Sequence, residues 1–144
     1  MNVNLCRYPF VRALRPSHLR PTTPLYRAAK MTTAAPTKHK FLVYAPDRAE
    51  EGTFEKRMSV RPAHLENATS LISSGFSRVV GALGTPESVT SPNKKLVGSV
   101  LIVEAESIDE VKAKVEADVY YTNDVWDKER LVILPFFPAP GINI

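Results

Sequence analysis

The sequence predicts an α+β fold of the ferredoxin-like type, in which strands and helices follow in the order β-α-β-β-α-β and the sheet is antiparallel. Two observations lead to this prediction. Short apolar segments, rich in Val, Ile and Leu, are bounded by proline, glycine or polar clusters, as strands are. Two segments between them instead carry apolar residues at helical spacing.

The first strand is expected at residues 39–46, HKFLVYAP, where a final proline ends it. Phe41 and Val43 fall on one face of this strand. Leu42 and Tyr44 fall on the opposite face, so both faces are apolar.

A polar loop, residues 47–57, leads to the first helix, which is expected over about 60–74. Pro62 then lies in the first turn, where its missing N–H has no cost. Gly75 stands where a helix commonly ends in a left-handed residue.

The second strand is expected at residues 76–84, where Gly81 suggests a bulge or a close backbone approach. A polar turn or loop, 85–95, connects it to the third strand at 96–105. The third strand is rich in Val, Ile and Leu, which favours a central place in the sheet.

The second helix is expected at about 108–117, and Ser107 with Glu110 forms a capping box at its start. A connection rich in aromatic residues, 118–126, leads to the last strand at 130–137. The apolar residues of the helix repeat at helical spacing, and they are Ile108, Val111 and Val115.

Charge divides the chain into a basic leader and a mildly acidic body. Residues 1–40 hold eight Lys or Arg and no acidic residue, whereas the rest holds 11 basic and 15 acidic residues. We expect three parts. Residues 1–38 are a basic targeting segment and Pro/Thr linker, mostly disordered. Residues 39–138 form the folded domain, and residues 139–144 are a C-terminal tail. The leader is typical of a mitochondrial transit peptide, and a start at Met31 would instead give a cytosolic protein. The body lacks the basic face that nucleic-acid binding requires.

Several chemistries are excluded by composition. Cys6 is the only cysteine and lies in the leader, so the body has no disulfide and no cysteine nucleophile. Its two histidines, His39 and His64, lack metal-ligand spacing, and no glycine-rich phosphate loop is present. The apolar runs are too short to cross a bilayer. We expect no metal, no cofactor and no membrane insertion.

The strands are apolar on both faces, and the two helices can cover only one of them. Burial of the other face against a second copy is the simplest solution. The sequence therefore predicts a homodimer packed sheet to sheet.

His64 and Asp118 are the main candidates for chemistry. His64 shares one side of its helix with Ala68 and Leu71, and Asp118 ends the apolar stripe of the second helix. Each has an ordinary interpretation, as a core residue and as a cap of the turn that follows. Because both helices pack on one sheet face and a buried polar group is costly when unpaired, we expect the two to pair. A carboxylate that orients an imidazole supports general acid–base catalysis.

Three other residues are candidate substrate contacts. Arg61, near the start of the first helix, could meet an anionic group or simply be solvated. Ser99 lies mid-strand and faces either the sheet packing or a pocket. Tyr120, with the neighbouring aromatics, closes a core edge or lines a pocket.

The segment EKRMSVRPAHL, residues 55–65, resembles the YCII-related (YciI-like) domain family, whose pattern there is R-P-x-H-L. The resemblance covers roughly residues 39–138. It continues through Gly75, GALG (81–84), GS (98–99), ESIDEVKA (106–113) and DVYYTNDVW (118–126).

The resemblance implies a dimeric α/β-barrel protein, related to ferredoxin-like proteins such as muconolactone isomerase. It also implies an active-site His–Asp pair, which corresponds to His64 and Asp118. One branch of the family is associated with dehydrochlorination of a chlorinated hydroxyhydroquinone, which is a precedent for lyase-type proton abstraction. Val119 stands where the family usually has proline, and a looser turn after Asp118 is expected.

The function predicted from the sequence is a small cofactor-independent enzyme. It would use His–Asp acid–base chemistry, of a lyase, dehydrochlorinase or isomerase type, on a small aromatic or enol-type molecule. The alternative is a non-catalytic ligand-binding or structural dimer in which the same pair only satisfies itself.

Overall fold

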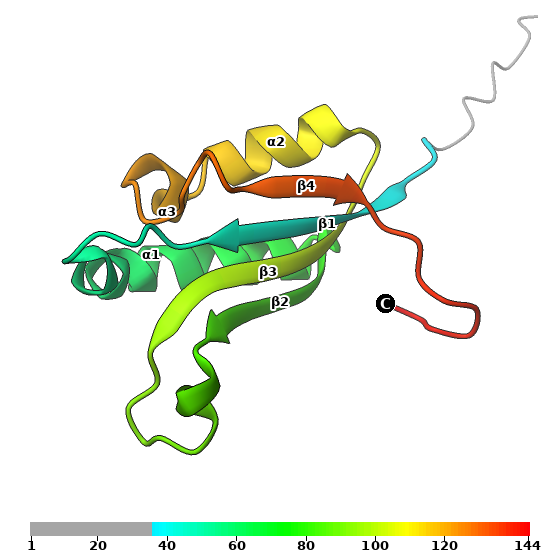
Figure 1. Ribbon diagram of the computed structural model, residues 1–144. Helices are drawn as coiled ribbons and strands as arrows, with labels where there is room; N and C mark the ends of the chain where they lie inside the picture. The colour runs from blue at the N-terminus through cyan, green and yellow to red at the C-terminus, as the bar shows by residue number, and fades with distance from the viewer. Residues whose placement is uncertain (1–35) are drawn as a thin grey trace, which may run out of the picture. The chain divides into compact units, whose positions relative to one another are not determined.

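The computed structural model describes residues 36–144, so most of the expected leader lies outside the described residues. A four-stranded sheet has the order β2-β3-β1-β4, and its pairings are antiparallel. Figure 1 shows the helices on one face of this sheet. This is the split β-α-β arrangement, so the predicted fold class is confirmed. The elements are β1 (His39–Pro46), α1 (Thr53–Ser73), β2 (Ser77–Gly84), the 3₁₀-helix η1 (Pro86–Val89), β3 (Leu96–Ala105), α2 (Ile108–Glu116), α3 (Val119–Thr122) and β4 (Val132–Pro135).

The core lies between the sheet and the helices. Phe41 and Val43 of β1 are buried on this side, whereas Leu42 and Tyr44 point to the other side, as the alternation predicts. The largest fully buried side chains of the described residues are Trp126, Tyr120, Val43, Val103, Val111 and Val125. The aromatic connection after α2 therefore belongs to the core.

Helix α1 begins seven residues earlier than predicted, at Thr53 instead of residue 60. Gly52 has φ 84°, and its carbonyl accepts a hydrogen bond from the N–H of Lys56 at 3.0 Å. Pro62 therefore lies inside the helix, where it removes one backbone hydrogen bond. The other end agrees with the prediction, because Gly75 follows the helix with φ 76°.

Gly98, rather than Gly81, marks the close backbone approach in the sheet. A Cβ on Gly98 would lie 2.9 Å from the carbonyl oxygen of Ala45 on the neighbouring strand. A Cβ on Gly81 would meet only Val100, at 3.9 Å. The register irregularities of β2 fall near its two ends, so the bulge expected at Gly81 is not there.

The capping box of α2 is present in an altered form. The Oγ of Ser107 accepts the N–H of Glu110 at 3.2 Å, as predicted. The carboxylate of Glu110 accepts the N–H of Glu106 at 2.9 Å instead of the N–H of Ser107.

Two other elements differ from the prediction. β4 is shorter than expected, and the polar turn between β2 and β3 contains η1.

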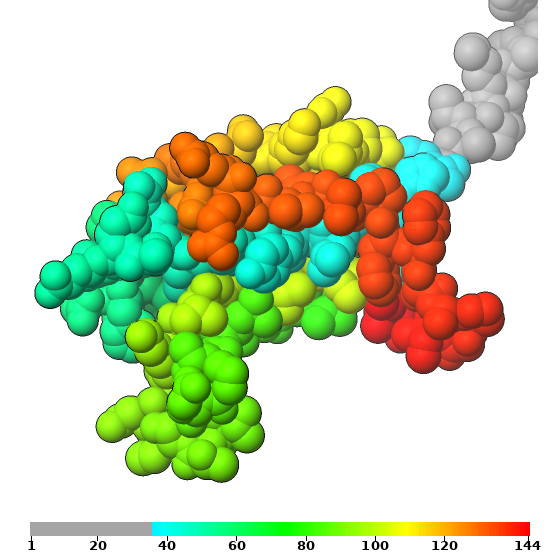
Figure 2. Space-filling model, viewed as in Figure 1, coloured from blue at the N-terminus to red at the C-terminus, as the bar shows by residue number. Residues whose placement is uncertain are grey.

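The sheet face turned away from the helices, here called the open face, is apolar. It carries Leu42, Tyr44, Val79, Leu83, Val100, Ile102, Val132 and Leu134, which are exposed or half-buried. Figure 2 views this face, where β4 (orange), β1 (cyan) and β3 (yellow-green) lie side by side with no helix over them. Among residues 36–144, no helix combines the length and apolar character needed to cross a membrane.

Candidate active site

His64 of α1 and Asp118, which precedes α3, form a buried pair. The Nδ1 of His64 lies 2.9 Å from Oδ1 and 3.0 Å from Oδ2 of Asp118. His64 is only 6% exposed and Asp118 only 5%. Because a carboxylate can only accept, Nδ1 carries the proton and donates it, and Nε2 of the neutral ring is left with its lone pair.

Asp118 is held by the backbone and by a second side chain. Its Oδ1 accepts the N–H of Tyr120 at 2.8 Å, and its Oδ2 accepts from Nδ2 of Asn67 at 3.1 Å. Val119 occupies the first position of α3, where a proline's missing N–H would not be used by the helix. The carboxylate of Asp118 caps the helix with valine at this position, and the looser turn stays a prediction.

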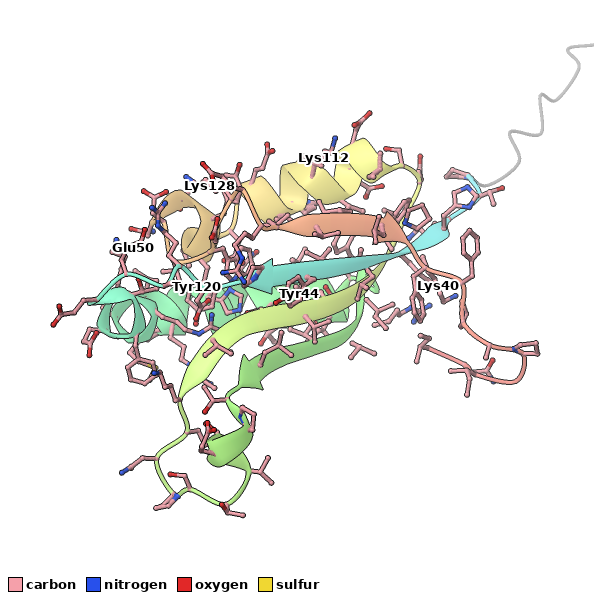
Figure 3. All side chains as sticks on the ribbon, in the orientation of Figure 1. Lys40, Tyr44, Glu50, Lys112, Tyr120 and Lys128 are labelled. Atoms are coloured by element: carbon pink, nitrogen blue, oxygen red, sulfur yellow. The ribbon has the colours of Figure 1, made fainter. Side chains whose placement is uncertain are left out.

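Tyr120 fixes the plane of the imidazole. The rings of His64 and Tyr120 stack with centroids 3.9 Å apart at 20°, and Trp126 meets His64 edge-on at 5.9 Å. The guanidinium carbon of Arg57 lies 4.4 Å from the Tyr120 centroid, so Arg57 and His64 must occupy opposite faces of that ring. Figure 3 places Tyr120, which belongs to α3, near the end of β1 and close to α1. Burial raises the pKa of Tyr120, with Arg57 and Arg61 acting against that rise, so its phenol stays protonated at neutral pH.

A buried ion pair beside the two residues supports this arrangement. Nη1 of Arg57 donates to Asp47 at 2.6 Å, and Nη2 donates to Oγ of Ser99 at 3.0 Å. Burial raises the pKa of Asp47, and the charge of Arg57 works against that rise. Oδ2 of Asp47 and Nε of Arg57 are buried without a hydrogen-bond partner among the described residues.

Asp47, Arg57 and Asn67 were not singled out from the sequence. Arg57 was read as part of a polar loop, because α1 was expected to begin later. Its spacing of seven residues from His64 is the signal that could have found it, since two helical turns return to the same side. Asp47 had no local signal.

The sequence-predicted residues meet at one cavity of about 130 Å³. His64, Arg61, Ser99 and Tyr120 line it, together with apolar side chains such as Leu101. Asp118 does not line it and stands behind the imidazole. The structure thus brings the five candidate residues together, while their roles in binding or catalysis stay a prediction.

A larger groove of about 550 Å³ lies elsewhere, along the 47–55 segment and the start of β3. It contains no histidine and none of the candidate residues. Tyr44 of the open face forms part of its wall, so the groove adjoins that face. Size alone would favour this groove as a site, but it contains no imidazole and the Asp47 carboxylate in its lining is paired with Arg57, so we favour the smaller cavity.

A buried imidazole oriented by a carboxylate and facing a small cavity is an arrangement that general acid–base catalysis can use. The chain belongs to the YCII-related domain family, which it matches over residues 39–136. Among residues 36–144, no three histidine, cysteine, aspartate or glutamate side chains gather as metal ligands would.

Relatives of known sequence and structure share this domain. Protein YciI of Escherichia coli is 33% identical over 96 residues, which cover 67% of this chain and 94% of the relative. Fusaric acid biosynthesis protein 2 of Gibberella moniliformis is 30% identical over 97 residues, 67% of this chain and 91% of the relative. The solved 5-chloro-2-hydroxyhydroquinone dehydrochlorinase of Burkholderia phenoliruptrix, in complex with 2,5-dihydroxybenzoquinone, is 26% identical with a TM-score of 0.59, covering 69% of this chain and 95% of its own.

Proposed function

We propose that the protein is a cofactor-independent enzyme that moves a proton on a small organic molecule, with His64 as the acid–base group and Asp118 as its orienting partner. One observation carries the proposal. Both oxygens of Asp118 lie within 3.0 Å of Nδ1, so the proton of a neutral His64 is held there. The other nitrogen is then free to accept a proton from a molecule in the cavity.

The relatives support the reaction class. One is named as a dehydrochlorinase, and others are named as proteins of biosynthesis. Loss of hydrogen chloride requires a base that takes a proton while chloride leaves with the bonding electrons. An isomerase-type reaction needs the same base, followed by return of the proton to another atom. His64 can serve both.

The proposal is tested by hydrogen–deuterium exchange at the ring carbons of 2,5-dihydroxybenzoquinone in D₂O, followed by NMR. Because general acid–base catalysis contributes about 10²–10⁴-fold, His64→Gln should slow the catalysed exchange by at least about 100-fold. Asp118→Asn should slow it as well, since an amide can present its N–H to Nδ1 and select the wrong tautomer.

His39→Gln is the matched control, because it removes the other histidine of the described residues, which is exposed on β1. It should exchange at the wild-type rate. If a folded His64→Gln variant behaves like His39→Gln, or if the wild type does not accelerate exchange, the enzyme proposal fails. The non-catalytic ligand-binding dimer is then the better reading.

A further inference from the structure

Arg61 brings to the cavity a positive charge that has no carboxylate partner within ion-pair distance among residues 36–144. It lines the cavity and is half-buried, and it forms no ion pair or hydrogen bond with another residue of 36–144. The other arginine at the cavity, Arg57, is paired with Asp47, and the neutral His64 donates its Nδ1 proton to Asp118. The charge of Arg61 also acts inside the site, since it opposes the rise in the pKa of Tyr120.

Ser99 supplies a hydrogen-bond donor to the same cavity. The residue is 3% exposed and lines the cavity, and its Oγ accepts a hydrogen bond from Nη2 of Arg57 at 3.0 Å. Because this bond occupies an acceptor position of the hydroxyl, the Ser99 proton remains free to be donated. The ion pair between Arg57 and Asp47, at 2.6 Å, holds Arg57 in the position that orients Ser99.

The cavity limits the size of what can bind. Its volume is about 130 Å³, and a cavity of about 150 Å³ is known to take up benzene. One six-membered ring is therefore about as much of a ligand as this cavity can enclose. The stacked rings of His64 and Tyr120 are 20° from parallel and form part of one wall.

We propose that this cavity binds an oxyanion through two groups, Arg61 and Ser99. The oxyanion is a phenolate, enolate or carboxylate on a molecule no larger than one small ring. This inference rests on the proposed function and adds its substrate class. In the proton transfer, Nε2 of His64 takes the proton from the carbon next to a carbonyl, the C–H electron pair forms a C=C bond, and the carbonyl π pair moves onto its oxygen, which Arg61 and Ser99 hold as the resulting oxyanion. The charge that develops is then placed where the two donors already are.

The test uses two pairs of probes that differ in charge: benzoate with benzamide, which are alike in shape, and 2,5-dihydroxybenzoquinone with hydroquinone, which also lacks two of the oxygens. Binding is followed through the ring-nitrogen resonances of His64 and the indole N–H of Trp126. The anionic member of each pair should bind at least tenfold more tightly. Arg61→Gln should abolish that preference, and Ser99→Ala should weaken the binding of the anions severalfold.

Arg78→Gln is the matched control, because it removes one exposed arginine that pairs with Glu104 and does not line the cavity. The inference is overturned if the neutral probes bind as tightly as the anions, if Arg61→Gln changes the preference no more than Arg78→Gln, or if no probe shifts the resonances at millimolar concentration. His64→Gln separates the two proposals. It abolishes deuterium exchange if the proposed function holds, whereas the anion preference, read at Trp126, should persist in it.

Discussion

Arg57 is buried with its partner, and this makes it a sensitive residue of the site. Its side chain is 2% exposed and that of Asp47 is 6% exposed, with 2.6 Å between their charged atoms. Replacing Arg57 by Met would leave Asp47 as a buried carboxylate without a counter-charge. Breaking a buried pair in this way costs about 3–5 kcal/mol, and we expect Arg57→Met to lower the free energy of unfolding by that amount, measured in urea.

The same variant should change how stability depends on pH. Burial already raises the pKa of Asp47 above its ordinary value, against the opposing effect of Arg57. A raised carboxyl pKa means that the folded state binds its proton more readily than the unfolded state, so stability falls as pH rises through that range. Removing Arg57 raises the pKa further, and the deficit of Arg57→Met should therefore grow between pH 4 and pH 7.

Two comparisons decide whether the buried pair is the cause. Adding Asp47→Asn to Arg57→Met removes the unpaired charge and should recover much of the lost stability. Arg48→Met breaks the exposed pair with Glu50 and should have little effect. Equal losses in Arg57→Met and Arg48→Met would contradict the prediction.

At this scale the sequence revealed the residues that stand out locally. An imidazole and a carboxylate at the ends of apolar stripes are unusual in any local context, so His64 and Asp118 could be singled out. Arg57 and Asp47 look like ordinary solvated residues until their burial is known. The partner of Arg57 in β3, Ser99, is 42 residues away, and nothing in the local pattern joins them.

The contact between β1 and β3 depends on a residue without a side chain. A Cβ on Gly98 would lie 2.9 Å from the carbonyl oxygen of Ala45 and 3.1 Å from Cα of Pro46. Both neighbours are backbone atoms, so they can move only if the strands separate. We expect Gly98→Ala to destabilise the fold by about 1–3 kcal/mol in chemical denaturation.

Gly81→Ala provides the control on the adjacent strand. Its added Cβ would make an ordinary contact of 3.9 Å with Val100, and a strand glycine is itself weakly unfavourable. This variant should be neutral or slightly more stable than the wild type. If the two substitutions behave alike, the close approach does not explain the glycine at position 98.

Glu104 links three strands at the far end of the sheet. It pairs with Lys40 of β1 at 2.9 Å and with Arg78 of β2 at 2.7 Å. The hydrogen bond from Lys40, and then that from Arg78, lowers the pKa of Glu104. A lowered carboxyl pKa adds stability above the unfolded value of 4.5, and this contribution is lost as pH falls through the folded value.

Glu104→Gln should therefore reduce the free energy of unfolding at pH 7 by about 0.5–1 kcal/mol, and less in high salt. The difference from the wild type should shrink steadily below pH 4.5. A deficit that is the same at pH 3 and pH 7 would exclude the ion pairs as its cause.

At the scale of elements, predictions held where the hydrophobic pattern alone defines a segment. β1 and β3 have the predicted bounds, because both are continuous apolar strands with clear ends. The start of α1 could not be predicted, since it depends on the left-handed backbone of Gly52 and on a buried arginine in a polar segment. The length of β4 was overestimated, because apolar residues continue past Pro135, the last residue that pairs with β1.

At the scale of the whole molecule, the open face is the feature that the chain does not satisfy by itself. Leu42, Ile102 and Leu134 form one row across three strands, and Tyr44 and Val132 belong to the next row. Exposed fractions reach 39% at Tyr44 and 52% at Leu134. Contiguous exposed apolar surface of this kind is typical of an interface.

We propose that two copies pack through their open faces, and Leu134→Lys tests it. In a symmetric dimer a charge introduced on this apolar face is present twice in the interface, so its effect on association is doubled. We expect the wild type to show the mass of a dimer in light scattering at micromolar concentration and Leu134→Lys to show that of a monomer. Ile72→Lys, at an equally exposed position (52%) on α1 in the helix layer, should leave the dimer intact.

Since dimer formation stabilises the folded chain by mass action, the wild type should also melt at lower temperature on dilution, whereas Leu134→Lys should not. A monomeric wild type, or equal masses for the two lysine variants, would show that the open face is covered by something other than a second copy.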